Sequence, residues 1–176
     1  MDRLFSDFIL STFIIPYVLL NIMTVVLEGD IPKVTAYMIK DHLRILSLFD
    51  GFEITFNQDL INRLESLYKF EWHIEKHLFI EERAIFSSLK VDKDTREELN
   101  LFLKISEQHT EIINEIKKLY NNLKNDIDID TMKLRDILNQ HLNFEEKVAY
   151  PKLDEIITET EKNLLLNQIQ DIIYEA

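Results

Sequence analysis

The sequence predicts an all-α protein, an antiparallel up-down four-helix bundle, and three observations support this. The 176 residues include only 2 glycines and 3 prolines, too few for the many turns of a β protein. Apolar residues make up 46% of the chain, enough to fill a core, and they recur at the three- and four-residue spacing of a helix. Short breaks separate four such stretches, and short connections favour antiparallel neighbours.

The first two central helices are predicted from their end signals. Pro32 opens the first helix, which runs to Asp50, where Gly51 is expected to stop it. Residues 51–57 mix aromatic, β-branched and glycine residues, so a loop is expected there. The second helix is expected to run from Asn57 to about residue 89.

The remaining helices follow the same logic. A turn at residues 91–94 precedes the third helix, which continues to about residue 124. After a polar connection, Asp130 is expected to cap the fourth helix, which should end before Pro151. Thr158 is expected to cap a short C-terminal helix.

Residues 1–30 form an apolar segment ahead of the bundle, which takes up residues 31–176. No charged residue occurs from Phe8 to Leu27, so the run is long enough to span a bilayer and membrane association is an alternative. However, its polar residues share one side of a helix, Pro16 would interrupt a span, and no basic cluster flanks it. We therefore favour a packed helix or helix pair that contacts a second copy or a partner, in a cytoplasmic protein.

The overall composition excludes several classes of function. The formal net charge is −12, and so acidic a surface repels phosphate backbones, which argues against nucleic acid as a partner. The chain has no cysteine, which excludes disulfides, zinc–thiolate sites and cysteine-ligated iron–sulfur clusters.

A doubled motif carries the chemistry that the sequence predicts. The stretch HLFIEE that begins at residue 77 recurs as HLNFEE at residue 141, and one further histidine precedes each copy. Because positions i and i+4 lie on one face of a helix, each copy directs an imidazole and a carboxylate toward the same point. Two such units in one bundle predict a site for two metal ions. The predicted ligands are His42, His77, Glu81, His109, His141 and Glu145.

This donor set restricts the metal and its chemistry. Imidazole and carboxylate without thiolate suit Fe, Mn, Zn or Cu better than Ca or Mg. Glu81 and Glu145 are placed to bridge two ions, and each ion could receive two histidines. Positions would stay open for a small ligand such as O₂, NO or peroxide, or for a metal-bound hydroxide.

Neighbouring polar residues have more than one interpretation. His73 lies one turn before His77 and could be a fifth imidazole ligand, a hydrogen-bonding group behind a ligand, or a core residue. Glu82 and Glu146 are expected to be solvated or paired with the adjacent basic residues. Two tyrosines, Tyr68 and Tyr150, are expected to pack in the ordinary way rather than to act in redox chemistry.

These stretches resemble a known family, the hemerythrin-like (HHE cation-binding) proteins. The segments KHLFIEERAIFSSL, QHLNFEEKVAYPKL, IKDHLRIL and EQHTEI carry the resemblance, which covers about residues 33–173. It implies an antiparallel four-helix bundle around a non-haem di-iron centre, held by the six residues named above. Ile113 stands where the oxygen carriers have a second histidine, and Glu145 stands where they have an aspartate. The set is therefore more similar to the di-iron proteins of nitrosative stress and iron–sulfur cluster repair.

Three functions follow from the pattern and the resemblance, in order of preference. The first is a di-iron protein that binds or senses O₂ or NO. The second is an enzyme in which the same centre serves oxidative or nitrosative stress defence, by oxidant scavenging or iron–sulfur cluster repair. The third is a structural helical protein with an incidental metal. Two Fe ions are expected from the resemblance, with Mn or Zn as alternatives. The sequence does not decide whether the centre binds a ligand reversibly or turns it over as a substrate.

Overall fold

The described part of the chain consists of helices joined by short connections, which confirms the all-α prediction. The structure, a computed structural model, describes residues 33–86 and 96–174, and within these ranges it contains helices and no strand. The apolar segment predicted at residues 1–30 and the turn predicted at residues 91–94 lie outside the described residues. The expectations of partner or lipid contact through that segment therefore stay predictions.

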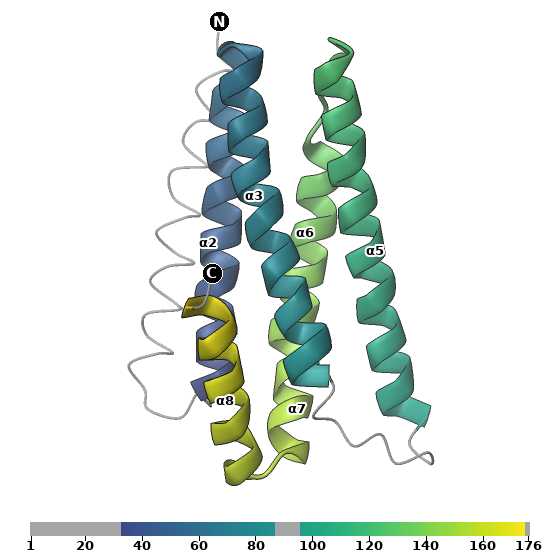
Figure 1. Cartoon of the computed structure of the whole chain (residues 1–176). Helices are drawn as coiled ribbons and strands as arrows, with labels where there is room; N and C mark the ends of the chain where they lie inside the picture. The colour runs from purple at the N-terminus through teal and green to yellow at the C-terminus, as the bar shows by residue number, and fades with distance from the viewer. Residues whose placement is uncertain (1–32, 87–95, 175–176) are drawn as a thin grey trace, which may run out of the picture.

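Four long helices form the body of the molecule (Figure 1): α2 (Lys33–Ile54), α3 (Leu60–Ile80), α5 (Arg96–Lys124) and α6 (Met132–Phe144). Helix α2 packs on α3, α3 on α5, and α5 on α6, with consecutive helices antiparallel. The ring closes between α6 and α2, where Arg135 donates to Asp50 at 2.7 Å and Thr131 donates to Glu53 at 2.8 Å. Each helix therefore presents one face to a shared axis.

The first helix extends past Gly51, contrary to the prediction that it stops there. Helix α2 runs to Ile54, and the short 3₁₀ turn η1 (Thr55–Asn57) follows where a loop was expected. The physical reason is the fully buried ring of Phe52, which packs against Phe49 and Phe56. Burying an aromatic ring outweighs the roughly 1 kcal/mol by which glycine disfavours a helix.

The second helix begins later than predicted, at Leu60 rather than Asn57. Asp59 caps it, since its carboxylate accepts a hydrogen bond from the Asn62 backbone N–H at 2.9 Å. At its other end the helix continues directly into a π-helical turn, η2 (Glu81–Ile85).

Helix α6 also continues into a π-helical turn, η3 (Glu145–Ala149), and then into α7 (Tyr150–Ile156). The fourth helix was predicted to end before Pro151. Instead the proline lies in the first turn of α7, where the missing N–H is tolerated, so the helical path is not broken. Neither π turn was predicted from the sequence.

The cap predicted at Thr158 is confirmed, whereas Thr131 and not the predicted Asp130 occupies the N-cap position of α6. The Asp130 carboxylate accepts a hydrogen bond from the Met132 backbone N–H at 2.9 Å, at the start of α6. Thr158 and Glu161 form a capping box at the start of α8 (Glu159–Tyr174): each side chain accepts from the backbone N–H of the other residue. Helix α8 is the predicted C-terminal helix, and it packs against α2.

Two apolar clusters fill the bundle, one on each side of a polar layer. The cluster toward α7 and α8 includes Met38, Ile80 and Ile105, and the cluster toward the other end includes Ile45 and Ile112. In each of the four helices, the buried histidine lies between a residue of one cluster and a residue of the other. Apolar side chains therefore cover the polar layer on both sides along the bundle axis.

None of the described helices is both long enough and apolar enough to cross a membrane.

The unbroken helix at Gly51 predicts that Gly51→Ala stabilises the protein by about 0.5–1 kcal/mol, because alanine loses less backbone entropy on folding. A Cβ atom built there has no neighbour within 4 Å, so the methyl group fits without strain. Urea unfolding of the two proteins measures the change. A Ser47→Ala variant, at an exposed position of the same helix, is the control for a general alanine effect. A less stable Gly51→Ala protein would contradict a continuous helix at this residue.

Candidate metal centre

All six predicted ligand residues meet in the polar layer of the bundle. They form two groups, within each of which one nitrogen or oxygen atom per residue lies within 4.8 Å of the others. The first donor group is His42, His77, Glu81 and Glu145, and the second donor group is Glu81, His109, His141 and Glu145. All six residues are at most 3% exposed. The two glutamates belong to both groups, as expected for residues that bridge two ions.

Each of the four long helices contributes one histidine, and the two π turns contribute the glutamates. Glu81 and Glu145 are each the first residue of a π turn, which closes when the backbone N–H five residues later donates to the glutamate carbonyl oxygen. The duplicated motif is therefore duplicated in backbone conformation as well as in residues. Single π turns inside α-helices are rare and occur often at functional sites.

The oxygen atoms of Glu145 are divided between the two groups. Oε1 lies 3.1 Å from His141 Nε2 and 3.8 Å from His109 Nε2, in the second donor group. Oε2 lies 3.4 Å from His42 Nε2 and 3.9 Å from His77 Nε2, in the first. This orientation suits a carboxylate that spans two cations.

Glu81 is oriented differently. Its Oε2 atom lies between the groups, 3.2 Å from His109 Nε2 and 3.7 Å from His77 Nε2. Its Oε1 atom accepts a hydrogen bond from the Tyr150 hydroxyl at 2.6 Å. One oxygen of Glu81 thus faces both groups while the other is held by a tyrosine.

Every imidazole in the layer has its outer nitrogen, Nδ1, against an oxygen atom. Nδ1 of His77 lies 2.9 Å from Asp41, and Nδ1 of His42 lies 2.8 Å from Glu146. Nδ1 of His109 lies 3.0 Å from Glu82, and Nδ1 of His141 lies 3.3 Å from Gln108. Such partners fix the ring orientation and leave Nε2 free to bind a cation.

The role of Glu82 and Glu146 was not predicted from the sequence. They were expected to be solvated or paired with Arg83 and Lys147, yet each contacts a buried imidazole of another helix. The signal was present in the motif: both copies have a second glutamate, turned about 100° from the first and so toward a neighbouring helix. Asp41 and Gln108, each directly before a candidate ligand, were also missed.

His73 lies outside the layer, and its contacts decide between the three interpretations that the sequence left open. Its Nε2 atom is 2.8 Å from Asp41, which also accepts from His77. His73 belongs to neither donor group. The hydrogen-bonding position behind a ligand is therefore the one that the structure shows.

The two tyrosines singled out in the sequence differ. Tyr68 is 59% exposed, as expected for a residue without a role in the layer. Tyr150 is buried, and its hydroxyl reaches Glu81 and also lies 3.0 Å from His42 Nε2. Tyr150 therefore packs in the core as expected, and its hydroxyl also makes contacts in the layer that the sequence did not predict.

The layer has the character of a metal site because most of its inward-facing atoms make no hydrogen bond. Among the described residues, the buried atoms without a hydrogen bond include five from this layer: His77 Nε2, Glu81 Oε2, His109 Nε2, His141 Nε2 and Glu145 Oε1. An unpaired buried polar group costs about 1–3 kcal/mol. Five such atoms aimed at one region fit cations of the kind that imidazole and carboxylate bind.

Comparison with known protein families points the same way. The sequence profile of the hemerythrin HHE cation-binding domain matches residues 34–153, more than half of the chain. The chain belongs to this family. No match was found among curated proteins or among solved structures. Together with the buried histidine and glutamate groups, membership of the hemerythrin HHE family shows a metal-binding protein.

The charges in this hemerythrin-type layer are strongly coupled. Burial by itself lowers the pKa of His77, but the carboxylates of Glu81 and Asp41 raise it to about 10. Burial also acts to lower the pKa of His109, but the nearby carboxylates of Glu145 and Glu81 raise it to about 10. Burial and the other imidazoles instead lower the pKa of His141 to about 3.

The carboxylates shift in opposite directions. Burial and repulsion by Glu145 raise the pKa of Glu81. Burial also acts to raise the pKa of Glu145, but the surrounding imidazoles, beginning with His141, hold it well below its usual range. Without a cation, the layer is therefore held together by imidazolium–carboxylate attraction.

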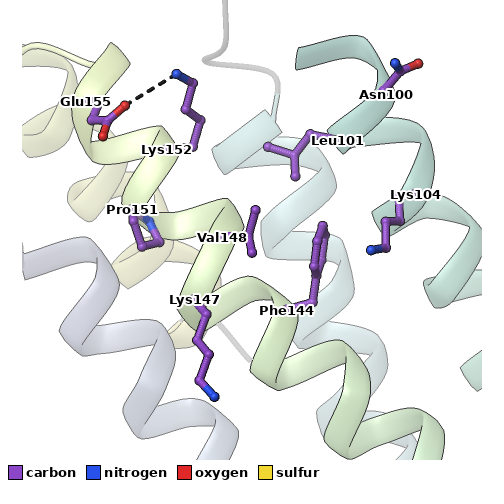
Figure 2. A pocket seen from close by; sticks show the side chains of 9 residues that line it. All are labelled: Asn100, Leu101, Lys104, Phe144, Lys147, Val148, Pro151, Lys152 and Glu155. Atoms are coloured by element: carbon purple, nitrogen blue, oxygen red, sulfur yellow. Dashed lines mark hydrogen bonds and ion pairs between the residues drawn. The ribbon is translucent and has the colours of Figure 1, made fainter. Parts of the chain in front are cut away.

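Two surface hollows lie near the layer, and they differ in whether they reach it. A groove of about 460 Å³ lies between α5 and the η3–α7 stretch, where Leu101, Phe144 and Val148 line it (Figure 2). None of the six candidate ligands lines it. A second hollow of about 340 Å³, between α3 and α5, is lined by His109 and Glu82. Solvent therefore approaches the second donor group along the α3–α5 side.

The geometry predicts which histidines are needed for metal. His77→Ala and His141→Ala should each lose metal, because each removes a donor from the layer. His73→Ala should keep its metal, with affinity lowered by no more than about 10–100-fold, as for other residues behind a ligand. Metal analysis of the three purified proteins measures this. Equal loss in all three would contradict the ligand set.

The pKa values predict that metal binding releases protons. At pH 7, below the pKa of about 10 of His77 and His109, both imidazoles are protonated in the metal-free protein. A metal-bound imidazole must be neutral, so protons compete with the cation and affinity should rise from neutral pH toward about 10. Calorimetry at pH 7 in buffers of different ionisation enthalpy counts the protons released. Binding without proton release would contradict these protonation states.

Proposed function

We propose that the protein holds a non-haem di-iron centre that binds or senses a small diatomic ligand, O₂ or NO. The observation that supports this most strongly is that two donor groups share Glu81 and Glu145. Imidazole and carboxylate donors suit iron, manganese and zinc alike, so iron is preferred because the chain belongs to the hemerythrin HHE family.

The six candidate ligands would be divided between two ions. His42 and His77 would hold one ion, and His109 and His141 the other, with Glu81 and Glu145 between them. The oxygens behind the imidazoles keep each Nε2 atom directed inward. Two imidazoles and two bridging carboxylates leave an iron ion with open positions, and such positions are what a small exogenous ligand needs.

The surroundings favour an uncharged ligand. Apolar clusters lie on both sides of the layer, and the six donors are almost fully buried. A charged or bulky substrate would lose its hydration without gaining partners. The hollow between α3 and α5 provides an approach to His109 for a molecule of a few atoms.

A second candidate is an enzyme of oxidative or nitrosative stress defence that uses the same centre. The specific observation in its favour is the hydroxyl of Tyr150, a buried proton donor within 3.4 Å of both shared carboxylates. Reduction of a bound oxidant needs such a proton, whereas reversible binding does not.

Stopped-flow mixing of the anaerobically reduced, iron-loaded protein with O₂, NO and peroxide separates these functions. We expect a rapid spectral change with O₂ or NO that reverses when the gas is removed. A Glu145→Ala variant, which lacks one shared carboxylate, is the control and should not respond. Continuous consumption of an oxidant would favour the enzyme, and no response to any ligand would contradict both.

A further inference from the structure

The hydroxyl of Tyr150 contacts the two donor groups unequally. It lies 2.6 Å from Glu81 Oε1, 3.0 Å from His42 Nε2 and 3.4 Å from Glu145 Oε2. His42 belongs to the first donor group alone, and Glu145 Oε2 is the oxygen that faces that group. Tyr150 therefore occupies the side of the layer where a cation of the first donor group would bind.

The unpartnered atoms show the complementary pattern. In the second donor group all four donor residues offer a buried atom without a hydrogen bond: Glu81 Oε2, His109 Nε2, His141 Nε2 and Glu145 Oε1. In the first donor group the inward nitrogen of His77 is also unpartnered, but that of His42 is engaged by Tyr150. In the second donor group the inward atoms thus have only one another as close polar neighbours, whereas in the first a phenol hydroxyl occupies one of them.

We infer that the two positions fill in order, with the second donor group binding its cation first and more tightly. A cation in the first donor group must displace the Tyr150 hydroxyl from His42 Nε2 and compete with it for Glu145 Oε2. Those hydrogen bonds are lost on binding there, and each bond to a charged group is worth enough to change affinity about tenfold. This inference rests on the proposed function, since it supposes that two cations bind.

The hydroxyl that contacts the two donor groups unequally comes from one position at which the two copies of the motif differ. Tyr150 lies five residues after Glu145, and the residue five after Glu81 is Phe86. The ring of Phe86 is buried and packs edge-on against Phe102 at 5.5 Å, and it has no hydroxyl to donate. Phenylalanine is thus the residue that the other copy of the motif places there, which makes Tyr150→Phe a conservative test.

The outer partners of the imidazoles act in the opposite direction. His42 and His77, which belong only to the first donor group, have their outer nitrogens against the carboxylates of Glu146 and Asp41. A carboxylate in this position makes the imidazole a more basic ligand. In the second donor group His141 faces only the neutral amide of Gln108. If the hydroxyl sets the order, its removal should narrow the difference in affinity or reverse it.

Anaerobic calorimetric titration with ferrous ion tests the order of filling. The unaltered protein should show two binding events of different affinity. His109→Ala should lose the tighter event, and His42→Ala the weaker one. Tyr150→Phe should tighten the weaker event about tenfold. Tyr68→Phe removes a hydroxyl from an exposed tyrosine and should change neither event.

The outcomes separate this inference from the proposed function. If no ferrous ion binds, the di-iron proposal itself fails. If two ions bind with equal affinity, or if Tyr150→Phe leaves the weaker event unchanged or weakens it, the inference is overturned and the metal centre stands. Circular dichroism of each variant checks that it is folded, and the His42→Ala result assigns the weaker event without relying on Tyr150.

Discussion

The structure depends on one constraint: two carboxylates and four imidazoles are buried together between two apolar clusters. Glu81 and Glu145 are fully buried, and repulsion between two such charges would oppose folding if nothing compensated it. Imidazolium groups compensate in the metal-free protein, and cations can do so in the loaded one. Around this layer, the outer oxygens from Asp41, Glu82, Glu146 and Gln108 follow from the need to orient each ring.

The duplication of the motif explains both the symmetry of the centre and its departure from symmetry. Each copy supplies a histidine, a shared glutamate at the start of a π turn, and a second glutamate that supports an imidazole of another helix. The copies differ five residues after the shared glutamate, where one has Phe86 and the other Tyr150. On our inference, this one hydroxyl decides which of the two positions fills first.

Much of this was predictable from the sequence, for physical reasons that can be named. Helical periodicity and the i, i+4 spacing of His77 and Glu81 fix which side chains share a face, so the bundle and the meeting of the six residues could be expected. The prediction at Gly51 failed because local propensity was outweighed by the burial of Phe52, which only the tertiary structure shows. The π turns and the contacts of Tyr150 depend on how neighbouring helices pack, and no periodicity reports that.

The central proposal is that the layer holds two cations with Glu81 and Glu145 shared between them, and anomalous diffraction tests it most directly. Crystals of the protein reconstituted anaerobically with iron should show two anomalous peaks at the iron absorption edge. One peak should lie among the first donor group and the other among the second, with both glutamates between them. Absence of any peak in this layer, or peaks only at surface carboxylates, would contradict the account.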